Sequence, residues 1–299
     1  MLKKLFMLWI AVILLMPTEV FGQKAAEHPG LKLMNYYAGK IQDVHTVNPY
    51  IINIIAIYEI SHGRHIDEIR NYIIWYFNHL NYPDKAGLTG SIYDFEVNET
   101  GKEISTNNYD SVDGYAGTFL YLLNLYQLKT GDKSLLESNW NKIKDIAYLI
   151  SCLQDEDGLT QALPGGKNNV RYLMDNCEAY AGMKVFNELA LSVGYGQDAH
   201  YVETAEKMRK AILSILYDKR SGNFYWAIYD YRKHVSKWSV SYPDALAQLF
   251  PICFDVLNPN SKKAEVLWRE FNKRYKSKIN KFPLEQRMIY EMTGKKMSK

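Results

Sequence analysis

Three segments of this 299-residue sequence share one pattern of residues at a nearly constant spacing. They read DSVDGYAG from residue 110, DNCEAYAG from residue 175 and SYPDALAQ from residue 241. The fourth residue of each segment is acidic, and these acids, Asp113, Glu178 and Asp244, are separated by 65 and 66 residues. A fixed period of this length is typical of stacked supersecondary units, so it restricts the chain to a repeat architecture.

Two kinds of helix alternate along the sequence. Apolar residues recur at steps of three and four over 66–80, 136–150 and 201–215, which predicts amphipathic helices with one solvent-facing side. The segment 115–126 is apolar nearly all round, which predicts a helix buried on both sides. A last buried helix is predicted at FPLEQRMIYEM, residues 282–292.

The segments between the two kinds of helix also correspond. DKAGLTGSIYDF, DEDGLTQALPGG and KRSGNFYWAIYD each have a turn glycine (Gly87, Gly158 and Gly222) and then a short run with strand character. The repeating unit is therefore an exposed helix, a glycine turn, a short strand or hairpin loop, and a buried helix. A fourth, degenerate copy starts near Asn48, which lies 65 residues before Asp113.

Helix pairs of this kind can close into a ring with the buried helices inside, or they can stack into an open superhelix. About five pairs fit the sequence. The long loops all precede buried helices, so they lie on a single face. Loops of about 20 residues on one face favour a ring with a functional mouth.

The alternating helices, the repeated D-x-x-[DE]-[GA]-Y-A-G starts and the aromatic loops resemble the six-hairpin glycosidase superfamily, the (α/α) toroids. The resemblance implies an all-α toroid of about five to six helical hairpins, with short β-hairpin loops at the cleft end. It also implies catalytic residues at the mouth formed by the inner-helix starts. Members of the superfamily are mostly glycoside hydrolases, with some polysaccharide lyases and sugar epimerases, so a poly- or oligosaccharide is the implied partner.

The repeated acids have a structural interpretation. Asp110, Asp175 and Ser241 are good N-cap residues, and an acid three positions later completes a capping box. Negative charge in the first turn is also favoured by the helix dipole. Capping alone accounts for all three pairs.

The same acids have a catalytic interpretation, because in a toroid they would converge on one cleft. Glycoside hydrolysis needs two carboxyl groups that flank the scissile bond. We assign Asp113 as the general acid and Asp175 as the base, with roles that could be exchanged. The further catalytic candidates are Asp110, Glu178 and Asp244. The resemblance makes an inverting hydrolase plausible.

Aromatic side chains in the loops are candidates for sugar binding, because flat rings stack on the apolar faces of sugars. Packing under a hairpin is the alternative for each ring. Arg171 could pair with an acidic sugar or form a salt bridge to a capping aspartate. The substrate-binding candidates are Tyr109, Arg171, Tyr172, Trp226, Trp238 and Tyr242.

The first 22 residues read as a secretory signal peptide. Two lysines precede the apolar run Leu5 to Met16, and small residues stand at Val20 and Gly22. The run of 12 residues is too short to span a bilayer comfortably, so no stable membrane insertion is expected after cleavage. We predict a secreted or periplasmic protein with a single toroid domain over 23–299, since no Pro/Gly/Ser-rich linker divides the rest.

Composition removes some function classes. A net charge of +3 with mixed signs does not demand a nucleic-acid partner. No CxxC or HExxH pattern suggests a metal, and no cofactor is implied. Two alternatives to hydrolysis stay open: a non-catalytic glycan-binding or polysaccharide-assembly protein on the same scaffold, and a polysaccharide lyase or sugar epimerase with a proton-abstracting Tyr, His or Lys.

Overall fold

The computed structural model describes residues 28–37, 46–98, 100–165 and 170–298. The predicted signal peptide, residues 1–22, lies outside these ranges. Among the described helices, none combines the length and the apolar composition that crossing a bilayer requires.

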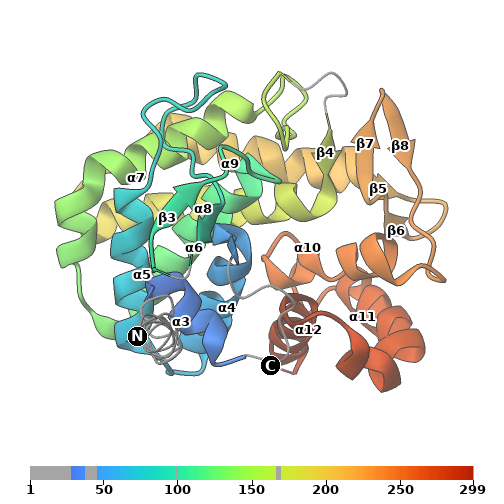
Figure 1. The fold of residues 1–299 in the computed structure, drawn as a ribbon. Coiled ribbons are helices and arrows are strands. Elements are labelled where there is room, and N and C mark those ends of the chain that lie inside the picture. The colour runs from blue at the N-terminus through green and yellow to red at the C-terminus, as the bar shows by residue number, and fades with distance from the viewer. Residues whose placement is uncertain (1–27, 38–45, 99, 166–169, 299) are drawn as a thin grey trace, which may run out of the picture.

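Inner helices form a closed ring (Figure 1). In the described part of the chain they are α4 (Pro49–Ser61), α6 (Val112–Thr130), α8 (Leu173–Ser192), α10 (Phe250–Cys253) and α12 (Leu284–Met297). Each packs against the next in this order, and α12 packs back against α4. The chain is therefore an (α/α) toroid, and the open superhelix is excluded.

Outer helices alternate with the inner ones along the chain. They are α3 (Pro29–Asn35), α5 (Ile66–Asn78), α7 (Ser134–Leu153), α9 (Ala199–Ala211) with its π-helical extension η1 (Ile212–Leu216), and α11 (Lys262–Tyr275). The amphipathic segments predicted at 66–80, 136–150 and 201–215 are confirmed as α5, α7 and α9 with η1. Each turns an apolar side inward, as Ile69 and Ile73 of α5 do.

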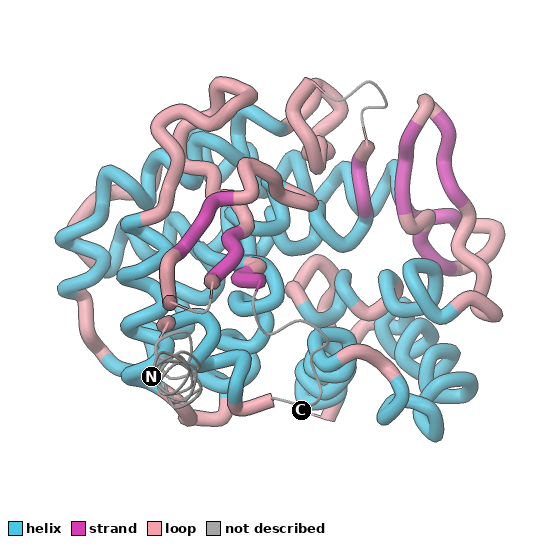
Figure 2. The backbone as a smooth tube through the Cα atoms, viewed as in Figure 1, coloured by secondary structure: helices cyan, strands magenta, loops and turns pink. Residues whose placement is uncertain are grey.

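Short strands lie in the loops that lead into the inner helices (Figure 2). One sheet has the order β1-β2-β3, with β1 (Thr46–Val47), β2 (Phe95–Val97) and β3 (Glu103–Ser105). A second has the order β4-β7-β8, with β4 (Arg171–Tyr172), β7 (Ala227–Tyr229) and β8 (Arg232–His234). The pair β5 (Tyr217–Asp218) and β6 (Asn223–Phe224) and the short helices η2 (Ser241–Ala245) and η3 (Lys276–Lys281) complete the elements.

The predicted turn glycines all adopt a left-handed backbone. Gly87, Gly158 and Gly222 have φ of 83°, 98° and 73°. Glycine reaches this region without the steric penalty of a Cβ atom, so the corresponding turns of three repeats depend on it. The predicted order of exposed helix, glycine turn and buried helix is thereby confirmed. The predicted strand run directly follows the glycine only after Gly222, as β6 and β7, whereas β2 starts at Phe95 and the run after Gly158 has only the single bridge between Gln154 and Thr160.

Two glycines one repeat apart let α6 and α8 approach closely. A Cβ atom on Gly117 would lie 2.5 Å from the carbonyl oxygen of Glu178, and one on Gly182 would lie 2.6 Å from that of Gly117. Real Cβ atoms do not come so near to backbone, so these positions require glycine. The crossing holds the starts of the two helices together.

The N-caps differ from the sequence prediction, which is a correction. Ser111, not Asp110, caps α6 and accepts a hydrogen bond from Gly114 N–H at 3.3 Å. The N-cap position of α8 is Tyr172, without a side-chain cap bond, so Asp175 lies inside the first turn. η2 starts after Val240, so Ser241 is not a cap either. Ser111 is the N-cap because it has an extended backbone and directly precedes Val112, the first residue of α6.

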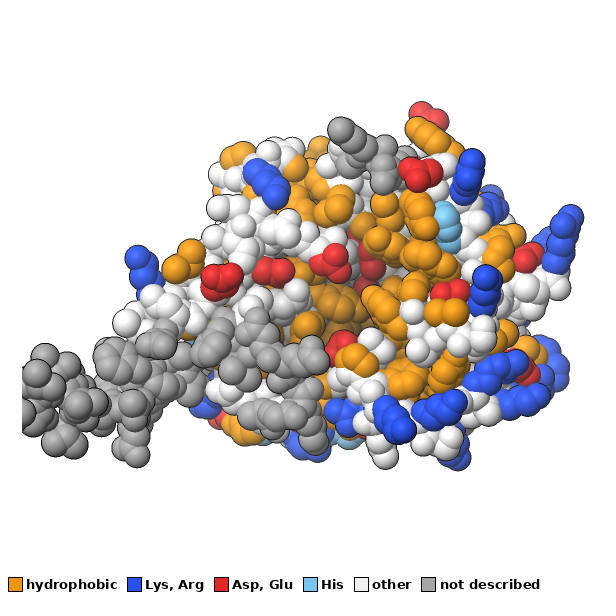
Figure 3. Space-filling view, turned by 45° about the vertical axis from the view of Figure 1, so that its right-hand side comes forward, with side chains coloured by type: hydrophobic (Ala, Val, Ile, Leu, Met, Phe, Trp, Pro, Cys, Tyr) orange, Lys and Arg blue, Asp and Glu red, His pale blue; other side chains and the backbone are white. Residues whose placement is uncertain are grey.

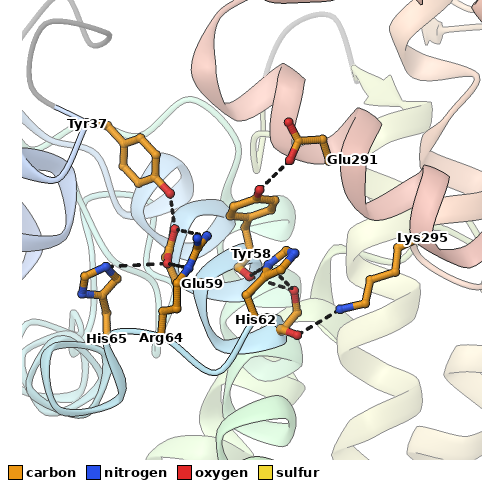
Figure 4. Close-up of polar contacts among 9 residues, drawn as sticks. Tyr37, Tyr58, Glu59, His62, Arg64, His65, Glu291 and Lys295 are labelled. Atoms are coloured by element: carbon orange, nitrogen blue, oxygen red, sulfur yellow. Dashed lines mark hydrogen bonds and ion pairs between the residues drawn. The ribbon is translucent and has the colours of Figure 1, made fainter.

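Polar contacts join α12, the last inner helix, to α4, the first (Figure 4). The Tyr58 hydroxyl of α4 donates to Glu291 Oε2 of α12 at 2.5 Å, and Lys295 Nζ donates to the Ser61 carbonyl at 3.0 Å. The neighbouring Glu59 is buried and accepts from the guanidinium of Arg64. These contacts lie at the end of α4 that is far from its start.

Candidate functional site

A cavity of about 200 Å³ lies where the inner helices begin. Its lining includes Asn48 and Tyr50 at the start of α4, Tyr115 of α6, and Phe250 of α10, together with residues of α8, η2 and α12. Figure 3 shows a hollowed face on which acidic side chains gather among hydrophobic ones. All five inner-helix starts of the described chain therefore meet at one site, as a toroid requires.

Three carboxyl groups line the cavity: Asp110, Asp175 and Glu285. Asp175 is only 8% exposed, and burial together with the charge of Asp113 raises its pKa well above the ordinary range. Glu285 is half-buried, and burial raises its pKa as well. Asp110 is exposed to solvent at the rim.

Asp113 does not reach the cavity. It is fully buried and accepts hydrogen bonds from Ser111 Oγ at 2.9 Å, Gly114 N–H at 2.9 Å and Thr160 Oγ1 at 2.6 Å. Burial raises its pKa to about 6, although these hydrogen bonds oppose the shift. Asp113 is not among the residues that line the cavity, so its position does not fit the predicted role of general acid, whereas Asp175 does line it.

Glu178 is buried directly behind the cavity wall. Its Oε1 accepts from the hydroxyl of Tyr50 at 2.9 Å, while Oε2 has no hydrogen-bond partner among the described residues. Burial and the nearby Asp175 raise its pKa well above the ordinary range. With a single hydrogen-bond donor and no cation beside it among the described residues, the Glu178 carboxyl is neutral rather than charged.

Asp244 lies apart from the other acids. Its Oδ2 accepts from the Lys237 N–H at 2.7 Å, which holds the segment between β8 and η2, and it does not line the cavity. The third repeat therefore contributes an aromatic side chain, Tyr242, to the cavity instead of its acid.

Asp94, which the sequence analysis missed, lies beside the cavity. Its Oδ1 accepts from the Tyr115 hydroxyl at 3.0 Å and its Oδ2 from Asn48 Nδ2 at 3.4 Å. Burial raises its pKa to about 6, and Asp110 adds to the shift. Asn48 is also new as a cavity residue, although its place in the first repeat was visible in the sequence.

The aromatic candidates separate into two sets. Tyr242 lines the cavity and is 55% exposed, while Tyr172 and Trp226 do not line it and stack on each other with ring centroids 6.1 Å apart. Tyr109 is buried and donates to Asp84, and Trp238 packs under the guanidinium of Arg274. Of the five aromatic candidates, only Tyr242 is among the described residues that line the cavity.

Arg171 is held by the carboxylates of the preceding turn. Its Nη1 lies 2.5 Å from Asp157 Oδ2 and 3.6 Å from Asp155 Oδ2. Arg171 therefore forms a salt bridge, as one of the two interpretations predicted, but with Asp155 and Asp157 and not with a capping aspartate. No group of three or more histidine, cysteine or acidic side chains in the described ranges is arranged to hold a metal ion.

No protein-family model and no curated protein sequence matches this chain. Solved structures do match. A rhamnosidase from Klebsiella oxytoca with rhamnose bound has a TM-score of 0.57 at 14% identity, over 93% of this chain and 52% of that one. The chain thus spans about half the length of that enzyme.

Two shorter proteins match over more of their own length. A GH63 mannosylglycerate hydrolase from Thermus thermophilus in complex with glucose has a TM-score of 0.58 at 10% identity, over 86% of this chain and 77% of that one. A β-1,3-1,4-glucanase from Paenibacillus sp. X4 has a TM-score of 0.52 at 12% identity, over 89% and 74%. At these identities the likeness establishes the fold alone: the chain has an (α/α)-toroid fold.

Proposed function

We propose that this protein hydrolyses the glycosidic bonds of a neutral oligo- or polysaccharide. The observation that carries the proposal is Asp175, a buried acid with a strongly raised pKa that opens into a cavity with two further carboxyl groups in its wall. The fold shared with several glycoside hydrolases supports it.

Asp175 has the properties of a general acid. A carboxyl group that keeps its proton at neutral pH can transfer it to the leaving oxygen of a glycosidic bond. Asp110 or Glu285, the other two carboxyl groups of the cavity lining, would then activate the attacking water. Tyr242 in the cavity wall would hold a sugar ring beside the reacting bond. The stacked pair Tyr172 and Trp226, outside the lining, would contact a sugar ring farther along the substrate.

The charge of the cavity favours a neutral sugar. None of the described residues that line it is a lysine, arginine or histidine, whereas Asp110, Asp175 and Glu285 are acidic. A uronic-acid carboxylate would meet this negative field without a cation to pair with. Lyases and epimerases that act on acidic sugars are therefore less well supported than hydrolysis.

The leaving group provides the test. We would incubate the chain and its Asp175→Asn variant with neutral oligosaccharides and with the corresponding dinitrophenyl glycosides, and measure kcat/KM. The variant should lose about 100- to 10,000-fold on the natural oligosaccharides. The loss should be much smaller on dinitrophenyl glycosides, because that leaving group departs without protonation.

Asp244→Asn is the matched control, because its carboxylate lies outside the cavity, and it should keep full activity. Asp110→Asn and Glu285→Gln identify the base: the base variant should lose activity on both kinds of substrate. An equal loss on both substrates in Asp175→Asn would contradict the acid role. Retained glycan binding without any product from the wild type would favour the non-catalytic alternative.

We also propose that the protein is exported, on the strength of the N-terminal sequence. Cell fractionation followed by N-terminal sequencing tests this. A mature chain that begins near Gln23 outside the cytoplasm would support export, and an uncleaved cytoplasmic chain would contradict it.

A further inference from the structure

Ser111 bridges two buried carboxyl groups from neighbouring helices. Its Oγ lies 2.9 Å from Asp113 Oδ1 of α6 and 2.8 Å from Asp175 Oδ2 of α8. A hydroxyl group has a single hydrogen, so it can donate to only one of the two carboxyls. Both contacts are hydrogen bonds only if the other carboxyl carries a proton and donates it to Ser111 Oγ.

The remaining hydrogen bonds identify which carboxyl is ionised. Asp113 also accepts from the Gly114 N–H and from the Thr160 hydroxyl. Several donors stabilise the charged form of a carboxylate. Asp175 has no second side-chain hydrogen bond to the described residues, so nothing comparable compensates a charge on it.

We infer that Asp113 is ionised and, through Ser111, holds the proton on Asp175. The Asp175 carboxyl donates to Ser111 Oγ, and the Ser111 hydroxyl donates to the Asp113 carboxylate. The inference rests on the proposed function, since it makes Asp113 and Ser111 positioning residues for the acid. It explains why an acid that never touches the cavity lies directly behind it.

The other titratable groups around Asp175 either raise its pKa, as Asp113 and Asp110 do, or carry no charge. After burial, the charge of Asp113 is the strongest influence that raises the pKa of Asp175, and Asp110 adds to it. Within the described ranges, no cation is among the groups that face Asp175 from the packed elements, which are Tyr50 of α4, Asp110, Asp113, Tyr172, Glu178, Tyr242 and Glu285. Removing the Asp113 charge should therefore release the proton of Asp175 at lower pH.

The test is an NMR titration that needs no substrate. We would label the full chain with ¹³C at the aspartate carboxyl carbons and follow their shifts from pH 4 to pH 9. The Asp175 signal is assigned by its absence in Asp175→Asn. In Asp113→Asn the Asp175 midpoint should fall by about 1 pH unit or more, because a like charge in contact shifts a carboxyl by about that much.

Three further variants guard against a folding effect and test the bridge. Asp244→Asn, equally buried but outside the group, should leave the midpoint unchanged. Ser111→Ala should lower it, because the neutral form of Asp175 loses its acceptor, and Ser111→Thr should restore it. An unchanged or higher midpoint in Asp113→Asn would overturn the inference, and a higher midpoint in Ser111→Ala would show that Ser111 donates to Asp175 instead.

The outcome is separable from the fate of the proposed function. A lowered midpoint with no hydrolysis of any glycan would preserve the proton assignment and refute the hydrolase. Hydrolysis by the wild type with an unshifted midpoint would do the reverse. Where activity is found, the high-pH limb of kcat/KM should move down by the same amount as the NMR midpoint in Asp113→Asn.

Discussion

Buried carboxyl groups lie at both ends of the inner ring, but their surroundings differ. At the end far from the cavity, Glu59 accepts from Arg64 Nε at 2.8 Å and Nη2 at 3.1 Å, and from the Tyr37 hydroxyl (Figure 4). At the cavity end, Asp113, Asp175 and Glu178 form no ion pair within the described ranges. Their partners there are hydroxyl groups and backbone N–H groups.

The presence or absence of a cation distinguishes Glu59, whose charge is compensated, from Asp113, Asp175 and Glu178, whose charges would not be. A cation beside a buried carboxylate offsets much of the cost of removing its charge from water. Without a cation, Asp175 and Glu178 must instead stay largely protonated, and the charge on Asp113 is compensated only by hydrogen bonds. Both conditions cost stability as the pH rises. Buried ionisable groups with shifted pKa values are typical of functional sites. Arg64 thus compensates the buried charge of Glu59 at the far end, whereas Asp175 and Glu178 at the cavity end keep their protons.

A substitution that separates α6 from α8 should lower the free energy of unfolding most, because the close crossing of these helices holds Asp113, Asp175 and Glu178 together. In Gly117→Ala the new Cβ would lie 2.5 Å from the Glu178 carbonyl oxygen and 2.6 Å from Ala179 Cα. We expect the free energy of unfolding in urea to fall by about 3 kcal/mol. Gly196→Ala, with nothing within 4 Å of its Cβ, should change it by less than about 0.5 kcal/mol. Equal losses would show that the crossing is not tight.

The pH dependence of stability should come next in size. Burial raises the pKa of Asp113 to about 6, against about 3.9 in an unfolded chain. A raised pKa in the folded state contributes stability that is complete below about pH 4 and is lost as the pH rises to about 6. Asp113→Asn has no such loss, so its stability relative to wild type should rise by about 2 kcal/mol between pH 4 and pH 7. A difference that does not vary with pH would contradict the buried, unpaired state of this acid.

The helical frame follows from local sequence, and the structure confirms it. Apolar periodicity predicted α5, α7 and α9, and the all-round apolar segment 115–126 predicted the buried α6, because burial on one side or two leaves a direct trace in the residue pattern. The turn glycines were predictable because a left-handed backbone favours glycine, the residue without a Cβ atom.

The site was only partly readable. Asp110 and Ser111 are both good caps, and a choice between adjacent residues depends on the backbone that enters the helix. Whether a first-turn acid faces the cavity, as Asp175 does, or the neighbouring helix, as Asp113 does, depends on the rotation of the helix about its axis. Glu285 had the available signal of an acid at the start of the last predicted inner helix, whereas Asp94 in its loop had none.

The same substitution at the two ends should have opposite consequences. At pH 7, Glu59→Gln removes the charge that accepts from Arg64, and we expect a loss of about 1 kcal/mol, moderated because Arg64 is half exposed. Glu178→Gln replaces a neutral carboxyl and keeps an oxygen for the Tyr50 hydroxyl, so it should not lower stability. Urea unfolding of both variants checks this. An equal loss in Glu178→Gln would mean that its charge is as well compensated as that of Glu59.

The smallest effect should come from the exposed contact that joins α4 to α12. The Tyr58 hydroxyl donates to Glu291 at the surface, where water competes for both groups, so Tyr58→Phe should cost no more than about 0.5 kcal/mol. Tyr72→Phe is the matched control, because its buried hydroxyl donates to Asn53 Oδ1 at 2.9 Å and the loss should be about 1.5 kcal/mol. Urea unfolding at neutral pH compares the two. If Tyr58→Phe costs as much as Tyr72→Phe, the far end of the ring is held by single polar contacts; otherwise the apolar packing of α12 on α4 closes it, and the ion pairs there only neutralise buried charge.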